Sequence, residues 1–147
     1  MNIFQSNNNE ETIQLGFEFA TLLNIGDIVF FYGDLGAGKT QFIKGICSYF
    51  KVTQNVTSPT FTIINQYEGI KESNFFNILH IDLFRIKNEK ELMEIGYNEF
   101  INEIQSIKLI EWAEKAHNYP TKPTYIININ ISEKNENSRE IKILSET

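Results

Sequence analysis

The segment Gly33–Thr40 reads Gly-Asp-Leu-Gly-Ala-Gly-Lys-Thr and matches the phosphate-binding pattern G-x-x-x-x-G-K-[S/T] in full. In such a loop the glycines let the backbone curl, so that successive N–H groups point at phosphate oxygens. The lysine reaches the β- and γ-phosphates, and the last hydroxyl ligates Mg²⁺. The motif therefore predicts a nucleotide site with Mg²⁺, built from Gly33, Asp34, Leu35, Gly36, Ala37, Gly38, Lys39, Thr40 and Gln41.

The residues on either side of the motif supply the structural context that it requires. Ile28–Tyr32 is an unbroken apolar run, which is typical of a strand buried on both faces of a parallel sheet. After the motif, apolar residues recur at helical spacing at Phe42, Ile43, Ile46, Cys47 and Phe50. A strand, a glycine loop and a helix in this order favour a phosphate site over a glycine-rich turn without a ligand.

Length and composition predict one domain, residues 1–147, with a packed core. The sequence has no apolar run long enough to cross a bilayer, and its start lacks the pattern of a secretory signal. Cys47 is the single cysteine, so no disulfide can form within the chain, and its place among apolar residues predicts a buried side chain. We therefore expect a cytoplasmic protein that does not enter a membrane.

The charge of the chain disfavours direct binding to nucleic acid. The formal net charge is −6, the sequence pI is about 5.0, and arginine occurs only at Arg85 and Arg139. A protein that holds DNA or RNA by itself usually needs a basic surface. We therefore expect no binding to DNA and only an indirect connection to RNA, through a partner protein.

The remaining pattern predicts a single-domain α/β P-loop NTPase fold, with a mixed parallel and antiparallel sheet flanked by helices. A helix should begin after Asn8, because Asn8 or Asn9 can cap it and acids follow in the first turn. Two strands, 61–67 and 78–83, should form an antiparallel pair joined by a long polar loop. Further elements are expected as short helices over 89–97 and 98–104, a strand over 107–110, and a terminal hairpin of 127–131 with 141–144.

Glu111 is the candidate for the second acidic group that a nucleotide triphosphatase needs near Mg²⁺. It directly follows the apolar run 107–110, where such a carboxylate commonly lies beside the phosphate loop. The alternative is a solvated glutamate at the end of a strand.

Asp82 is the other candidate acid, and it lies two residues after His80. On an extended segment both side chains share one face of the strand. A histidine and a carboxylate in this arrangement can position a metal-bound or attacking water molecule. A structural His–Asp pair at the edge of the core explains the pattern equally well.

Two further features accompany these acids. The loop Ser58-Pro59-Thr60-Phe61 follows the motif's helix, where related folds sense the γ-phosphate, although it can equally be a turn that starts a strand. Trp112, the sole tryptophan, is placed either to stack on a ligand or partner or to fill the core.

Taken together, these segments resemble the TsaE (YjeE-type) ATPases of bacterial tRNA threonylcarbamoyladenosine synthesis. The similarity runs in order through most of the chain, and one segment alone would be weak evidence. The matching segments are Thr12–Gly16, Gly33–Thr40, Ser58–Phe61, His80–Arg85 (His-Ile-Asp-Leu-Phe-Arg), Glu94–Gly96 and Ile110–Glu114. Phe84 stands where the family usually has tyrosine, and Ala113 replaces a common proline, which leaves the path of the chain after Trp112 open.

The resemblance implies slow ATP hydrolysis. Because arginine is scarce, we expect the stabilising cation to come from a partner, with Arg85 as the internal alternative, and hydrolysis to be weak in the isolated protein and modulated by partners. Lys39 would hold the phosphates, Thr40 and Glu111 would hold Mg²⁺, and Asp82 would assist hydrolysis. The implied partners are TsaB and TsaD, which modify adenosine 37 of tRNA, and the ATPase would reset their complex without touching the base.

Two other functions remain compatible with the sequence: a small-molecule kinase and a nucleotide-dependent docking module. A P-loop kinase for a small molecule usually closes an arginine-bearing lid over the phosphates, and two arginines outside any lid-like insertion disfavour it. A GTPase is disfavoured because no Asn-Lys-x-Asp motif occurs. A nucleotide-dependent docking module with incidental hydrolysis is not excluded by any residue.

Overall fold

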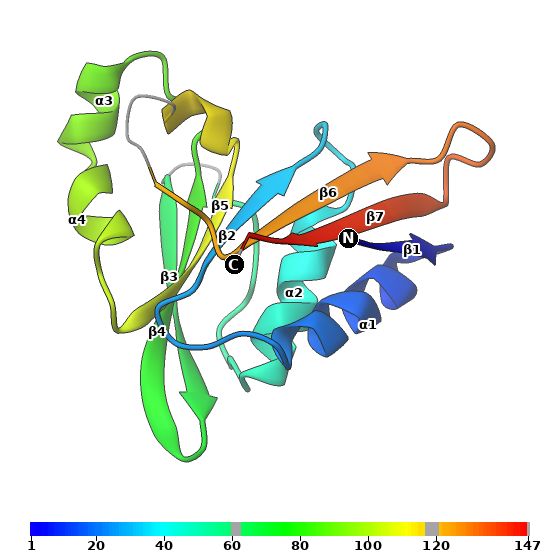
Figure 1. The fold of residues 1–147 in the computed structure, drawn as a ribbon, viewed down its shortest axis with the longest axis horizontal. Helices are drawn as coiled ribbons and strands as arrows, with labels where there is room; N and C mark the ends of the chain where they lie inside the picture. Colours follow the sequence, from blue (N-terminus) through cyan, green and yellow to red (C-terminus); the bar gives the residue numbers. More distant parts are fainter. Residues whose placement is uncertain (60–62, 117–120, 147) are drawn as a thin grey trace.

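The computed structural model describes residues 1–59, 63–116 and 121–146, in which seven strands form one sheet (Figure 1). The strand order is β1-β7-β6-β2-β5-β4-β3. The four central strands, β6, β2, β5 and β4, run parallel, and antiparallel strands extend the sheet on both sides. This confirms the predicted α/β fold with a mixed sheet. The strands are β1 (Asn2–Ser6), β2 (Ile28–Tyr32), β3 (Ile64–Lys71), β4 (Asn74–Asp82), β5 (Ser106–Glu111), β6 (Tyr125–Ile131) and β7 (Arg139–Ser145).

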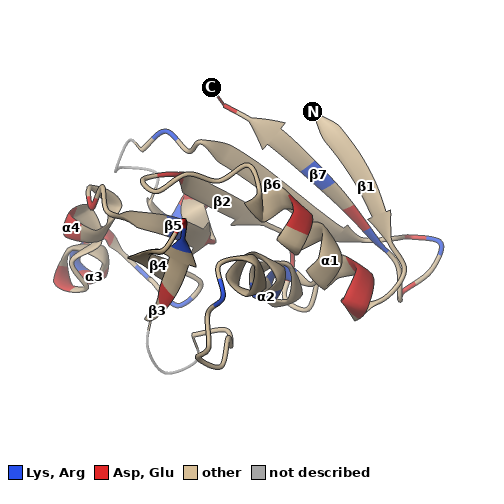
Figure 2. Ribbon diagram, turned by 90° about the horizontal axis from the view of Figure 1, so that it is seen from below, with Lys and Arg blue, Asp and Glu red and all other residues tan. Residues whose placement is uncertain are grey.

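Helices cover the two faces of the sheet at different places. Helices α1 (Asn9–Ala20) and α2 (Lys39–Tyr49) lie side by side under one face (Figure 2). The short helices α3 (Glu89–Glu94), α4 (Tyr97–Ile101) and η1 (Ala113–Ala116) contribute to a second apolar cluster on the other face. None of the helices in the described ranges has both the length and the apolar composition needed to cross a bilayer.

The two apolar clusters explain why β2 is apolar along its whole length. Val29 and Phe31 belong to the cluster under α1 and α2, whereas Phe30 packs against the cluster near α3 and α4. Burying the apolar side chains on both faces of this strand stabilises the folded state. The prediction of a doubly buried strand is confirmed, as is the burial of Cys47, which is 1% exposed.

Helix α1 begins as its sequence predicts. The Asn8 side chain accepts a hydrogen bond from Glu11 N, at 2.8 Å, and Glu11 accepts one in return from Asn7 N, at 2.7 Å. These two bonds satisfy N–H groups that the helix itself cannot pair.

Helices α1 and α2 approach so closely that their main chains touch. A methyl group on Gly16 would lie 2.0 Å from Phe42 O, and one on Gly45 would lie 2.0 Å from Ile13 O. Glycine at both positions therefore lets α2, which follows the phosphate loop, pack directly on α1.

The loop expected between β3 and β4 is not present. The two strands continue through eight register pairs to a tight turn at Glu72 and Ser73, with φ values of 50° and 68°. Two successive residues with positive φ match the twist of a hairpin, but Asn-Gly is the usual signal for this turn. Residues 61 and 62, with which the predicted strand began, lie outside the described residues.

The other elements follow the predictions more closely. Helices α3 and α4 fall inside the predicted ranges to within one residue, and the strand over 107–110 and the terminal hairpin are confirmed. Strand β1 was not predicted, because its few residues mix polar and apolar side chains and it pairs only with the distant β7.

Candidate functional site

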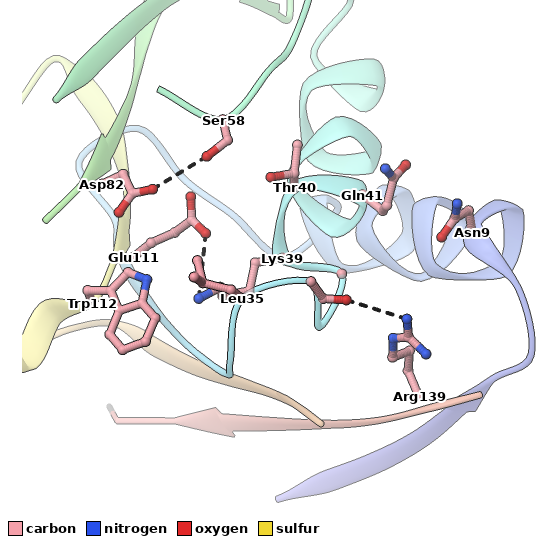
Figure 3. Close-up of a pocket in the computed structure, with 12 residues that line it drawn as sticks. Asn9, Leu35, Lys39, Thr40, Gln41, Ser58, Asp82, Glu111, Trp112 and Arg139 are labelled. Carbon is pink, nitrogen blue, oxygen red and sulfur yellow. Dashed lines mark hydrogen bonds and ion pairs between the residues drawn. The ribbon is translucent and has the colours of Figure 1, made fainter. Parts of the chain in front are cut away.

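A pocket of about 460 Å³ lies at the carboxyl ends of parallel strands, where ligands commonly bind in open α/β sheets (Figure 3). The pocket brings together the phosphate loop and the two predicted acids, Asp82 at the end of β4 and Glu111 at the end of β5. Those two residues are direct register partners. The lining residues are Asn9, Leu35, Gly36, Gly38, Lys39, Thr40, Gln41, Ser58, Asp82, Glu111, Trp112 and Arg139.

The phosphate loop is held by its own backbone and by the neighbouring strand. Gly33 has a φ of 147°, and a methyl group there would lie 2.3 Å from Ile129 O on β6. Ala37 N donates to Asp34 O at 3.0 Å, which closes a turn inside the loop. Asp34 and Ala37 thus shape the loop without lining the pocket, and the Ala37 side chain is buried in the core.

Lys39 lies at the floor of the pocket and is 5% exposed. Its ammonium group donates to Gly33 O at 2.5 Å and lies 3.8 Å from Glu111 Oε1. It also lies 4.5 Å from the centre of the Trp112 ring, where a cation is attracted to the ring face. Lys39 therefore lines the pocket with its ammonium group held by three neighbours.

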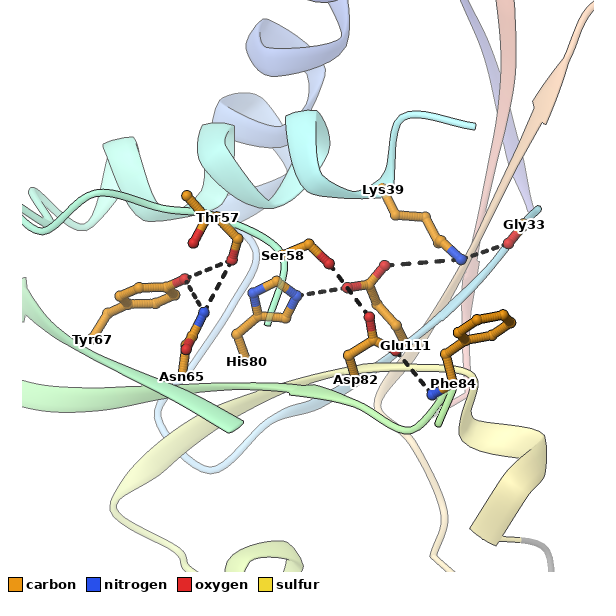
Figure 4. Close-up of polar contacts among 10 residues, drawn as sticks. All are labelled: Gly33, Lys39, Thr57, Ser58, Asn65, Tyr67, His80, Asp82, Phe84 and Glu111. Carbon is orange, nitrogen blue, oxygen red and sulfur yellow. Dashed lines mark hydrogen bonds and ion pairs between the residues drawn. The ribbon is translucent and has the colours of Figure 1, made fainter. Parts of the chain in front are cut away.

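Glu111 is 3% exposed, so the alternative of a solvated strand-end glutamate is wrong. Its Oε2 lies 2.7 Å from His80 Nε2, and His80 is fully buried (Figure 4). Because a carboxylate can only accept, Nε2 of His80 carries the hydrogen. The structural pair of His80 is thus Glu111, not Asp82 as the sequence suggested.

Asp82 is half-buried and has partners of its own. Its Oδ1 accepts a hydrogen bond from Phe84 N at 3.0 Å, and its Oδ2 accepts one from Ser58 Oγ at 3.4 Å. Burial raises the pKa of this carboxyl above its ordinary value of 3.8, and the nearby charge of Glu111 adds to the effect. The ionised carboxylate of Asp82 therefore costs the folded protein some of its stability.

This cost leads to a prediction for Asp82→Asn. A carboxyl with a raised folded-state pKa favours folding at low pH, and this contribution is lost as the pH rises through the raised pKa. We expect the variant to melt at a higher temperature than the native protein at pH 7, and the difference to shrink as the pH falls toward 3.8. Melting temperatures measured at several pH values test this.

The control for this prediction is Glu94→Gln. The Glu94 side chain is 62% exposed and forms an ion pair with exposed Lys90, so its loss should change the melting temperature little at any pH. A lower melting temperature of Asp82→Asn at pH 7 would contradict the prediction.

The segment that leads to the Ser58–Phe61 loop is fixed against β3. Thr57 O accepts hydrogen bonds from Tyr67 Oη at 3.2 Å and from Asn65 Nδ2 at 3.1 Å (Figure 4). Ser58 reaches the pocket through its bond to Asp82. Thr60 and Phe61, which carry the rest of this predicted switch-like loop, lie outside the described residues.

Trp112 is half-buried in a strained backbone conformation, with a φ of 59°. Its ring lies 4.9 Å from that of Phe84, measured between centres, and it covers Lys39. The residue thus borders the pocket and also packs against its neighbours, so both expectations for it remain open.

Two pocket residues were missed from the sequence. Asn9 begins α1, and Arg139 donates from Nε to Ala37 O at 2.8 Å. Arg139 is 102 residues from Ala37 in the chain, and no local pattern indicates such a contact. Arg85, considered as an internal cation, is exposed and does not line the pocket.

Comparison with known proteins decides the family. The family model described as threonylcarbamoyl adenosine biosynthesis protein TsaE matches residues 6–141, which is most of the chain. The chain belongs to the TsaE family. This confirms the resemblance seen in the sequence motifs.

Individual TsaE proteins are similar in sequence to this protein over most of its length. The tRNA threonylcarbamoyladenosine biosynthesis protein TsaE of Rickettsia felis is 40% identical over 95% of this chain and 77% of its own length. That of Aquifex aeolicus is 38% identical over 91% of this chain and 89% of its own length. The crystal structure of Bacillus subtilis YdiB superposes with a TM-score of 0.79 at 28% identity, covering 99% of this chain and 86% of YdiB.

Proposed function

We propose that this TsaE-family protein binds ATP with Mg²⁺ at the phosphate loop and hydrolyses it to ADP and phosphate. The N–H groups of the loop and of the first turn of α2 cradle the phosphates, and Lys39 neutralises the charge on the β- and γ-phosphates. The observation that carries this proposal is the convergence of Lys39, Glu111 and Asp82 on one pocket.

The donor atoms at the pocket fit Mg²⁺, which prefers oxygen ligands. Thr40 offers a hydroxyl and Glu111 a carboxylate, both on the lining of the pocket. Glu111 Oε2 is occupied by His80, whereas Oε1 is 3.8 Å from Lys39 and retains acceptor capacity. We assign Thr40 and Glu111 as the residues that would hold Mg²⁺; the bound ion would supply positive charge that offsets the negative charge developing on the phosphates.

Asp82 is the candidate for orienting the attacking water molecule. Its carboxylate lines the pocket beside Glu111 and is only weakly engaged by Ser58. A raised pKa makes the carboxylate a better proton acceptor than an exposed aspartate. These features support the role of assisting hydrolysis.

The family supports a role in the threonylcarbamoylation of adenosine 37 of tRNA, together with TsaB and TsaD. We propose that ATP hydrolysis resets the TsaB–TsaD complex, that hydrolysis is weak without these partners, and that the protein works in the cytoplasm. The net charge of −6, with acids spread over α1, α3 and α4 (Figure 2), supports contact with tRNA through the partners only.

A tRNA modification assay tests this proposal. Purified TsaB and TsaD are supplied with threonylcarbamoyl-adenylate, tRNA and ATP, and either the native protein or Lys39→Met is added. We expect repeated rounds of modification only with the native protein, and ATP hydrolysis that rises when the partners are present.

The other outcomes point to the alternative functions. If Lys39→Met supports modification equally well, hydrolysis is incidental and the protein is a docking module. If neither form has an effect although ATP binds, a small-molecule kinase becomes the function to test.

The metal role of Glu111 leads to a separate prediction for Glu111→Gln. The amide keeps the size of the side chain and can still accept from His80, but it is a poorer Mg²⁺ ligand. We expect the Mg²⁺ concentration for half-maximal hydrolysis to rise at least about tenfold. ATP binding measured in EDTA should change much less, and an unchanged Mg²⁺ requirement would rule out the ligand role.

A further inference from the structure

The side chain of Arg139 connects the phosphate loop to the turn between β6 and β7 by donating hydrogen bonds to main-chain carbonyl groups of both segments. Its Nε donates to Ala37 O at 2.8 Å, and Nη2 lies 3.4 Å from Gly36 O (Figure 3). Its Nη1 donates to Glu136 O at 2.6 Å and to Ser138 O at 3.2 Å, in the turn between β6 and β7. Within the described residues Arg139 forms no ion pair, so the guanidinium is committed to carbonyl groups.

The bond to Ala37 O determines the direction of a neighbouring N–H group. A trans peptide is planar, so the carbonyl of Ala37 and the N–H of Gly38 point in opposite directions. Fixing the carbonyl toward Arg139 therefore turns the Gly38 N–H away from Arg139. Gly38 lies on the pocket at the N-terminus of α2, where such N–H groups bind anions.

The glycines of the phosphate loop make its backbone flexible, so contacts from outside the loop help to fix its conformation. Gly33, Gly36 and Gly38 all have positive φ, and glycine has more conformational freedom to lose than any other residue. Inside the loop, Ala37 N donates to Asp34 O and Lys39 Nζ donates to Gly33 O. Arg139, at the start of strand β7, holds two loop carbonyl groups and so reduces the conformational entropy that the loop would otherwise lose when a ligand binds.

We propose that Arg139 is a positioning residue that holds the phosphate loop in its anion-binding conformation before the nucleotide arrives. It acts through the carbonyl groups of Ala37 and Gly36. The proposal rests on the proposed nucleotide site, but its effect on the loop exists without nucleotide.

Three variants separate this role from a general effect of charge. Arg139→Lys keeps the charge but loses the fork, and Arg139→Gln loses both. Lys142→Gln removes a charge from the same strand, at a side chain that pairs with Glu140 at 3.3 Å and does not contact the loop. The readouts are hydrogen exchange of the amides of residues 36–40 without nucleotide, the dissociation constant for ATP, and kcat against KM for hydrolysis.

We expect faster loop exchange and about tenfold weaker ATP binding in both Arg139 variants, the size expected for a lost hydrogen bond to a charged group. KM should rise more than kcat falls, and Lys142→Gln should behave like the native protein. Native-like exchange and affinity in Arg139→Lys would overturn the proposal, because charge alone would then suffice. If the native protein bound no ATP, the proposed function would fail. Hydrogen exchange of the loop amides would still test whether Arg139 holds the loop.

Discussion

Replacing Lys39 with methionine is expected to lower ATP turnover about 100- to 1,000-fold, the usual cost of removing one donor that stabilises a transition state. The Lys39 side chain is 5% exposed, and its ammonium group contacts Gly33 O, Glu111 and the Trp112 ring at the pocket. Methionine fills the same space beside Trp112 but carries no charge. Steady-state hydrolysis with saturating Mg²⁺ and partners present measures the effect.

The control for Lys39→Met must separate lost chemistry from lost stability. Without Lys39, the buried carboxylate of Glu111 retains His80 alone among its described partners, and a buried charge left without a counter-ion destabilises the folded state. We expect the double variant Lys39→Met/Glu111→Gln to recover stability in urea unfolding while remaining inactive. Native turnover in the single variant would contradict the assigned role of Lys39.

Replacing Gly45 with alanine is expected to lower the free energy of unfolding by about 3 kcal/mol. The new methyl group would lie 2.0 Å from Ile13 O and 2.7 Å from Phe17 N, and these main-chain atoms cannot rotate away. Helices α1 and α2 must therefore separate, which also moves the start of α2 at Lys39 and Thr40. Urea unfolding measures the stability, and nucleotide titration measures the consequence for the site.

Helix propensity makes the opposite prediction for Gly45→Ala, since alanine in a helix interior is favoured over glycine by about 1 kcal/mol. Ser48→Ala is the matched control, because Ser48 lies exposed on the same helix. It should change stability by no more than about 0.5 kcal/mol. A Gly45→Ala protein as stable as the native one would show that the two helices can move apart without cost.

Local patterns predicted the elements that depend on neighbouring residues. Apolar runs identified β2 and β5, helical spacing identified α2, and Asn8 followed by two acids identified the start of α1. The same patterns failed at the β3–β4 turn, because Glu72 and Ser73 adopt positive φ without the residues that usually signal it. There the pairing of the two strands decides the conformation.

By itself, the sequence determined the phosphate loop, the apolar strand and helix around it, the two candidate acids and the family. Each of these depends on residue identity and short spacing, so it can be recognised without the tertiary structure. The tertiary structure alone decided that His80 pairs with Glu111, that Gly16 and Gly45 let two helices touch, and that Arg139 reaches the loop. Those contacts join residues 26 to 102 positions apart, so they depend on strand order and helix packing, which no local pattern encodes.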